Sequence, residues 1–261
     1  MSDPSVSDNI PAAVREQTLA RFEQHRKAWQ SNQALRRLYG DWYGRLREAM
    51  PPVELGPRVE LGSGPGFARE FIPDLLLTDV VQASWHDRCV SAEALSFADE
   101  SLGALLLFDV LHHVEAPAKF FAEATRVLRP DDRLLLYEPY IGPVSRWVYG
   151  LFHEEPVDMR ADPWARTEAA GVGKDPFESN QAIPTLIFCR NAGVFAEKFP
   201  SLRVRSVERM AGFAYPFTGG FSRQPLLPTL AWNTLYAIEK HLPGAAFRLI
   251  GFRLLVVIER V

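Results

Sequence analysis

Apolar residues follow two different patterns along this chain from about residue 57 onward. Short continuous runs, such as Leu75 to Thr78 and Ala104 to Asp109, are typical of strands that are buried on both faces of a sheet. Pro117 to Leu128 instead repeats its apolar residues at the spacing of a helix. This alternation predicts an α/β fold with a doubly wound, mostly parallel sheet. The predicted strands are 57–61, 75–78, 88–90, 104–109, 133–137, 202–209 and 251–261, and a short helix is predicted at 67–72.

The first 52 residues predict a helical cap that precedes the main domain. Pro11 is a residue that suits the start of a helix, and Pro51 and Pro52 end the helical pattern. Gly40 lies inside it and predicts a bend or a break. We therefore expect a cap over 1–52 and a main domain over 53–261.

The stretch from about 141 to 200 departs from the alternating pattern. It is rich in Trp, Phe, Pro and Gly, and it is too long for a simple connection between two elements. We expect a helical or irregular insertion that covers a ligand site. Ser145 to His153 could contact a membrane surface, but it has a single basic residue, Arg146, which favours ordinary packing over membrane contact. After the insertion, 226–241 is predicted to be helical.

Composition narrows the function classes. The chain has 261 residues and a formal net charge of −3, whereas a dedicated nucleic-acid binder is usually basic. The two cysteines, Cys89 and Cys189, stand in apolar surroundings and are expected to be free thiols of a reducing compartment. We see no metal-ligand spacing, no secretory leader and no membrane-spanning run. A cytoplasmic protein of undetermined oligomeric state is the expectation.

The stretch VELGSGPGF, Val59 to Phe67, is the strongest chemical signal. Three glycines, Gly62, Gly64 and Gly66, allow the backbone to turn sharply and to approach a ligand closely. Dinucleotide sites prefer G-x-G-x-x-G, whereas here the third glycine comes one residue early. A carboxylate at Glu60 would be unfavourable beside a pyrophosphate but suits a ligand with a cationic amine.

The order of Glu60, the glycines, Asp79 and the segment FDVLHHV, Phe108 to Val114, resembles the class I S-adenosylmethionine-dependent methyltransferases, and within them the type-11-like small-molecule group. The resemblance implies a Rossmann-like seven-stranded sheet whose last strand is antiparallel. It also implies S-adenosyl-L-methionine as the cofactor and a small-molecule acceptor.

The same resemblance assigns roles to individual residues. Glu60 would act through the loop on the methionine amine, and Asp79 would hold the ribose hydroxyls. Ser91, which replaces the aspartate usual in the family, and Ala92 would contact the adenine, while the backbone at Phe108 meets the amino-acid end. The full expected cofactor set is Glu60, Gly62, Ser63, Gly64, Gly66, Asp79, Val80, Ser91, Ala92, Phe108 and Asp109.

The reaction implied is methyl transfer to an O, N or C nucleophile of a small or medium organic acceptor, such as a sugar, a quinone or a lipid-linked intermediate. His112 or Asp109 would be the catalytic base where the acceptor must lose a proton. Two alternatives stay open. One is a nicotinamide-dependent oxidoreductase, and the other is a non-catalytic module that binds S-adenosylmethionine.

Overall fold

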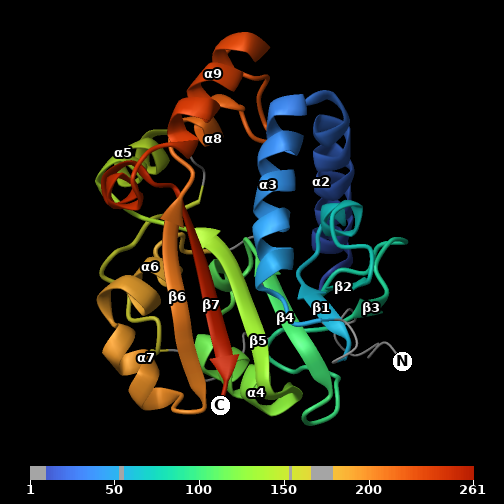
Figure 1. Ribbon diagram of the computed structural model, residues 1–261. Helices are drawn as coiled ribbons and strands as arrows, with labels where there is room; N and C mark the ends of the chain where they lie inside the picture. Colours follow the sequence, from blue (N-terminus) through green and yellow to red (C-terminus); the bar gives the residue numbers. More distant parts are fainter. Residues whose placement is uncertain (1–9, 53–55, 153–154, 166–178) are drawn as a thin grey trace.

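The fold is a single seven-stranded sheet with helices on both faces (Figure 1). The computed structural model describes residues 10–52, 56–152, 155–165 and 179–261. The strands are β1 Arg58–Leu61, β2 Leu75–Asp79, β3 Arg88–Cys89, β4 Leu102–Phe108, β5 Leu128–Pro139, β6 Leu202–Met210 and β7 Arg253–Arg260.

The strand order is β3-β2-β1-β4-β5-β7-β6. The strands β1 to β5 pair in parallel, and β7 lies antiparallel to both β5 and β6. The predicted fold class, including the antiparallel last strand, is confirmed. In this topology the carboxyl ends of the parallel strands meet at one edge, where open α/β sheets bind their ligands.

The N-terminal segment forms two helices, whereas the sequence predicts a helix bent or broken at Gly40. α2 spans Ala12–Ser31 and α3 spans Gln33–Ala49. The break lies at Asn32, whose side chain accepts a hydrogen bond from the Leu35 N–H (3.0 Å) and caps α3. Gly40 remains helical instead, and the Phe71 ring lies against it.

Each sheet face has its own apolar core. On one face, the aromatic and leucine side chains of α3 pack on alternate residues of β2, β4, β5 and β7. On the other face, α4 (Pro117–Val127) and α7 (Ala192–Lys198) cover the intervening residues. The α3 helix, which lies within the expected N-terminal cap, therefore packs into one of the two cores of the sheet.

The connections that flank β2 are short. The helix predicted at 67–72 is a single 3-10 turn, η2, over Phe67–Glu70, and β2 is joined to β3 by a loop. The α2 helix packs here instead: Trp29 stacks on Phe67 with ring centroids 4.1 Å apart, and Arg26 donates a hydrogen bond to the Pro65 carbonyl (2.9 Å). The N-terminal helices thus supply packing for this side of the sheet.

The segment expected to be an insertion is largely helical where it is described. It contains α5 (Pro143–Phe152), α6 (Ile183–Thr185), the π-helical turn η4 (Leu186–Arg190) and α7. Its second half belongs to the helical layer that covers one face of the sheet, because Phe188 and Phe195 pack on Phe121 of α4. Residues 153–154 and 166–178 of the expected insertion lie outside the described residues.

Helices after β6 cover the edge where the parallel strands end (Figure 1). They are α8 (Ala214–Phe217), α9 (Thr229–Lys240), the short turn η5 (Gly244–Ala246) and α10 (Phe247–Ile250). The predicted helix at 226–241 corresponds to α9. No helix in the described part of the chain is long and apolar enough to cross a membrane.

Candidate functional site: the glycine loop and the carboxyl ends of the strands

The glycine loop after β1 is held against β2. The Ser63 N–H donates to the Thr78 carbonyl (2.9 Å), and the Ser63 hydroxyl accepts from the Thr78 N–H (3.1 Å). Gly62, Gly64 and Gly66 all have positive φ, at 66°, 46° and 79°, which residues with a Cβ rarely adopt. The three glycines are thus required by the path of the backbone itself.

The three glycines differ in what lies beside them. A Cβ on Gly62 would meet Val110 at 2.5 Å, and a Cβ on Gly66 would meet Trp85 at 2.8 Å. A Cβ on Gly64 would have only an ordinary contact, 3.5 Å from a ring carbon of Phe22. The outer two glycines therefore serve close packing within the chain, and Gly64 is the position of the loop with room beside it.

Glu60 is buried below the loop. The Tyr43 hydroxyl donates to Glu60 Oε1 (3.0 Å), whereas Glu60 Oε2 has no hydrogen-bond partner within the described residues. Burial raises the pKa of Glu60 to about 7, although the hydrogen bond from Tyr43 opposes the shift. A buried acceptor without a donor is costly, and a cationic amine close to the loop would relieve that cost.

Asp79, at the end of β2, connects the loop to the next segment. Its Oδ2 accepts from the Gly64 N–H (2.9 Å) and its Oδ1 from the Val81 N–H (2.9 Å). Burial raises its pKa, while His86 and these N–H groups oppose the shift. Each carboxylate oxygen has a second lone pair, so Asp79 keeps acceptor capacity for a ligand hydroxyl.

A histidine and a tryptophan close the loop from the side of α2. His86 Nε2 and Trp85 Nε1 both lie within hydrogen-bond distance of the Gly64 carbonyl (2.7 and 2.8 Å). The Ala83 N–H donates to His86 Nδ1 (3.2 Å), which assigns the proton to Nε2. Sequence analysis missed both residues, because the short loop between β2 and β3 has no recognisable motif.

The expected adenine contacts lie beside Asp79. The Val90 N–H donates to the Asp79 carbonyl (3.0 Å). Ser91 and Ala92, which follow Val90 in the chain, therefore begin beside Asp79 and Val80 at the end of β2. The Ser91 hydroxyl accepts from the Glu93 N–H (3.2 Å) in its own turn. The structure therefore brings together Glu60, the loop, Asp79, Val80, and the start of the 91–92 segment.

The fourth-strand motif forms a second cluster with a residue that the sequence did not reveal. Asp109 has a positive φ of 59°, which is strained for a non-glycine residue, and it forms an ion pair with Arg253 of β7. Arg253 is 4% exposed. It donates a hydrogen bond to the Tyr215 hydroxyl (2.6 Å), and its guanidinium lies 5.8 Å from the Trp42 ring centroid.

Two polar atoms in this second cluster are unsatisfied within the described residues. They are Arg253 Nε and the Tyr137 hydroxyl, both buried. Phe108 and Trp42 stack on or against the Tyr137 ring, so the cluster is an aromatic environment with an unused cation donor. The only sequence signal for Arg253 was a lone charge at the head of the apolar run LLVVI.

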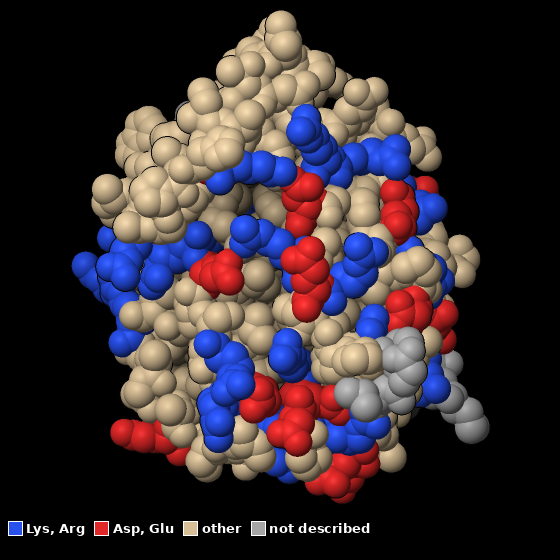
Figure 2. Space-filling model, viewed as in Figure 1, with Lys and Arg blue, Asp and Glu red and all other residues tan. Residues whose placement is uncertain are grey.

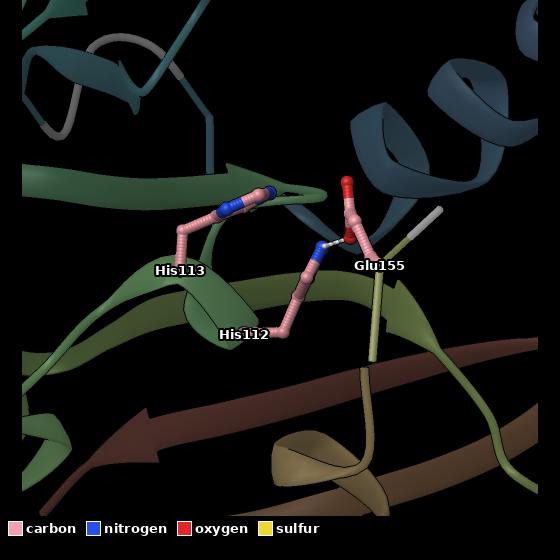
Figure 3. Close-up of side chains that lie close together, drawn as sticks. All are labelled: His112, His113 and Glu155. Carbon is pink, nitrogen blue, oxygen red and sulfur yellow. Dashed lines mark ion pairs between the residues drawn. The ribbon is translucent and has the colours of Figure 1, made fainter. Parts of the chain in front are cut away.

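His112 lies between two carboxylates from different segments. Its Nδ1 is 2.7 Å from Glu138 Oε2 and its Nε2 is 3.4 Å from Glu155 Oε2. Figure 3 shows the imidazole of His112 pointing at Glu155, with His113 to one side. Burial lowers the pKa of His112, but Glu138 and Glu155 outweigh it and raise the pKa to about 10.

The charge on His112 determines what this group can do. With a pKa near 10, the imidazole is protonated at neutral pH, and both ring nitrogens are donors. At neutral pH it therefore has no lone pair with which to accept a substrate proton. Glu138 is fixed in turn, because its Oε1 accepts from the N–H groups of Val110 and Leu111 (2.9 and 2.7 Å). The group holds the turn after β4 in place.

A family model matches the part of the chain that carries the glycine loop. Residues 59–136 match the family model described as a methyltransferase domain. This range includes β1, the glycine loop, Asp79 and the turn after β4. The chain contains a methyltransferase domain. The expected class, a methyltransferase, is confirmed, and this match is consistent with the expected cofactor, S-adenosylmethionine.

Solved structures share the fold of this methyltransferase at low sequence identity. One is a putative methyltransferase in complex with the Trm112 methyltransferase activator of Haloferax volcanii, with 16% identity, coverage of 95% of this chain and 97% of the other, and a TM-score of 0.51. Geranyl diphosphate C-methyltransferase from Streptomyces coelicolor A3(2), in complex with Mg²⁺, geranyl diphosphate and S-adenosyl-L-homocysteine, has 13% identity, coverage of 87% and 81%, and a TM-score of 0.47.

A putative methyltransferase from Bacillus halodurans C-125 has 16% identity, coverage of 83% and 97%, and a TM-score of 0.45. No curated protein matches the chain. These likenesses describe the fold of the methyltransferase, and its acceptor must be argued from its own residues.

The residues of this methyltransferase fit its cofactor. Glu60 offers a buried, unsatisfied oxygen, Gly64 leaves room beside the loop, and Asp79 has lone pairs to spare at the end of β2. These are the acceptors that an ammonium group and a ribose require. Phe22 of α2 and Trp85 of the loop between β2 and β3 lie against the glycine loop.

Proposed function

We propose that the chain transfers a methyl group from S-adenosylmethionine to a small or medium organic acceptor at the carboxyl ends of β4 and β5 and the amino end of β7. The observation that carries the proposal is the position of Asp109. It directly follows β4 within the methyltransferase domain, and its carboxylate pairs with Arg253 in an aromatic cluster. Cofactor residues and a buried polar cluster thus share the ligand edge of one sheet.

In this proposal the cofactor is held by the first cluster. Glu60 favours the methionine amine, Asp79 accepts the ribose hydroxyls, and the glycine loop lies along the methionine tail. Ser91 and Ala92 are assigned to the adenine side, and Phe108 to the amino-acid end. The bound cofactor supplies an activated methyl group, so the main task of the protein is to align donor and acceptor.

The acceptor is assigned to the second cluster. Arg253 Nε and the Tyr137 hydroxyl are buried donors without a partner within the described residues, so an acceptor with an oxygen-rich or anionic group would satisfy them. The aromatic rings around them suit an apolar body. Asp109 keeps a side chain that is 28% exposed and is the candidate proton acceptor, because His112 is already protonated at neutral pH.

Cofactor choice and turnover can be tested separately. The purified chain should gain thermal stability with S-adenosylhomocysteine and none with NADH, because binding to the folded state alone raises its melting temperature. A gain with NADH alone would favour the oxidoreductase alternative. Incubation with methyl-labelled S-adenosylmethionine and fractionated metabolite extracts should label a small organic product. Binding without labelled product in any fraction would favour a non-catalytic module.

A further inference from the structure

Exposed apolar side chains gather at one end of the molecule. Of the nine large apolar residues that are exposed in the described part of the chain, seven come from α5 and from the segment between β6 and β7. Leu230 is 80% exposed and Trp147 65% exposed. The apolar end, as we name it, consists of Trp147, Leu151, Phe213, Leu226, Leu230, Ile238 and Leu249.

The helices that carry these residues pack on one another. α10 contacts α5, and α8 contacts α9. The Phe252 ring joins the two pairs, because it lies against Tyr149 of α5 and against Phe213 at the start of α8. In Figure 1 these helices form the top and upper left of the molecule, beyond the strand ends. The apolar end is thus one continuous region.

Two of the helices direct an uncharged face outward. On α5, Trp147 and Leu151 are exposed at a spacing of four, while Tyr149 is buried. On α9, Leu230 and Ile238 are exposed two turns apart, and Trp232 is buried. Amphipathic helices normally bury their apolar stripe in the core, so apolar residues on the outer face as well need a different explanation.

The formal charges that the helices of this end expose are positive, and one of them, Lys240, is paired with Asp41 of α3. Residues 141–152 and 211–252 contain the basic residues Arg146, Arg223, Lys240 and Arg248, each exposed. Their sole acidic residue, Glu239, is buried and accepts from the Ala214 N–H (2.9 Å). The chain as a whole carries a net charge of −3, so this end departs from the rest. Figure 2 shows an upper end that is nearly free of red, with charged side chains of both signs further down.

We propose that the apolar end docks on the surface of a bilayer that contains anionic phospholipids. Protruding Leu, Ile and Trp side chains insert into the interfacial region, where Trp is favoured. The surrounding arginines are attracted by anionic headgroups. A second copy of the chain is the less suitable occupant, because a symmetric contact would place these cations against one another. The helices lie on the bilayer, since none described is able to span it.

The docking surface lies directly above the proposed acceptor cluster. Phe252 contacts both α5 and α8, and the next residue, Arg253, is the buried cation of that cluster. A membrane-resident, amphiphilic acceptor with a polar or anionic head would therefore reach Arg253 from the docked end. This consequence for the acceptor rests on the proposed function, whereas docking itself does not.

Vesicle sedimentation of the full chain tests the docking. The protein should bind vesicles that contain phosphatidylcholine and phosphatidylglycerol. It should bind vesicles of phosphatidylcholine alone much more weakly. The double variant Trp147→Ser/Leu230→Ser should lower the partition coefficient at least ~10-fold, because two interfacial anchors are lost. The matched control is Val194→Ser, an exposed apolar residue of α7 outside the apolar end, which should leave binding unchanged.

A second pair of variants tests the charge. Arg223→Glu/Arg248→Glu should weaken binding to anionic vesicles by at least ~20-fold, since each lost cation costs about fivefold. Arg203→Glu, an exposed residue at the start of β6, is the control. Equal binding to neutral and anionic vesicles by all variants would overturn the electrostatic part of the proposal.

Two outcomes would overturn the docking as a whole. One is the absence of vesicle binding by the wild-type chain at any anionic content. The other is a wild-type dimer in sedimentation that Trp147→Ser/Leu230→Ser converts to a monomer, because the surface would then belong to a second copy. The affinity for S-adenosylhomocysteine is measured for every variant. Vesicle binding without cofactor binding would leave docking standing and remove the proposed function.

Discussion

The glycine loop and the Asp109–Arg253 cluster lie at the same edge of the sheet but are built in different ways. In the loop, Glu60, Gly64 and Asp79 act largely through backbone groups within 20 residues of sequence. In the cluster, Asp109 meets a partner 144 residues away, and both groups are side chains. The glycine loop, which is assigned to the cofactor, is therefore a local structure. The Asp109–Arg253 cluster, which is assigned to the acceptor, depends on the assembly of the whole sheet.

The largest effect is expected when the ion pair of the Asp109–Arg253 cluster is broken. Arg253→Met should lower the free energy of unfolding by about 3 to 5 kcal/mol, because it leaves the Asp109 carboxylate without its partner. Chemical denaturation measures the change. Arg205→Met, which breaks an exposed pair with Glu259 (3.0 Å), should cost less than about 1 kcal/mol.

Asp109→Asn/Arg253→Met should be more stable than Arg253→Met alone, since no unpaired charge remains. If Arg253→Met and Arg205→Met cost the same, the cluster is not a buried ion pair, and the contrast between the two regions fails.

The second prediction concerns the glycine loop and its affinity for the cofactor product. Gly64→Val should weaken S-adenosylhomocysteine binding at least ~100-fold, or about 2.7 kcal/mol, because Gly64 has a φ of 46° and stands where the loop has room for a ligand. Gly44→Ala is the matched control: that glycine is in α3 with nothing within 4 Å of its added Cβ. It should bind normally and be slightly more stable. Equal affinities of the two folded variants would remove the loop from the site.

The third prediction uses pH to sharpen the comparison. The His112 pKa is raised from 6.5 to about 10 in the folded chain, so its stabilising contribution is complete below pH 6.5 and is lost as pH rises through 10. The stability advantage of the wild type over His112→Asn should therefore shrink by about 4 kcal/mol between pH 6 and pH 10.

The control for this pH series is His241→Asn, because His241 is exposed at the end of α9. That variant should keep the pH dependence of the wild type. An advantage over His112→Asn that stays constant across the window would show that His112 is neutral in the fold, and it would restore His112 as a candidate base.

The parts of the fold that were predictable depend on short-range patterns. Continuous apolar runs identified β2, β4, β5 and β7, because strands buried on both faces need no polar alternation, whereas β6 has no such run and was predicted from its alternating character. The N-terminal break was misplaced at Gly40, because the cap provided by Asn32 outweighs the low helix propensity of one glycine. The helix predicted after the loop is one turn, because the N-terminal helices fill the space beside it.

The candidate site divides in the same way. Glu60, the glycines and Asp79 could be assigned because their spacing along the chain is itself the signal. Arg253 and Glu155 could not, because nothing in their neighbours marks them and their partners come from distant segments. The protonated state of His112 follows from two carboxylates that only the fold brings together. The roles of the cofactor residues remain predictions until ligand binding is measured.

Calorimetric titration of S-adenosylhomocysteine into the wild type, Asp79→Asn and Asp87→Asn is the most direct test of the central claim. Both carboxylates accept backbone N–H groups, Asp79 from Gly64 and Asp87 from Leu77 (2.8 Å), but only Asp79 is assigned to the ribose. The account predicts one site per chain, at least ~10-fold weaker binding by Asp79→Asn, and unchanged affinity for Asp87→Asn. Equal affinities for all three proteins, or no binding by the wild type, would contradict it.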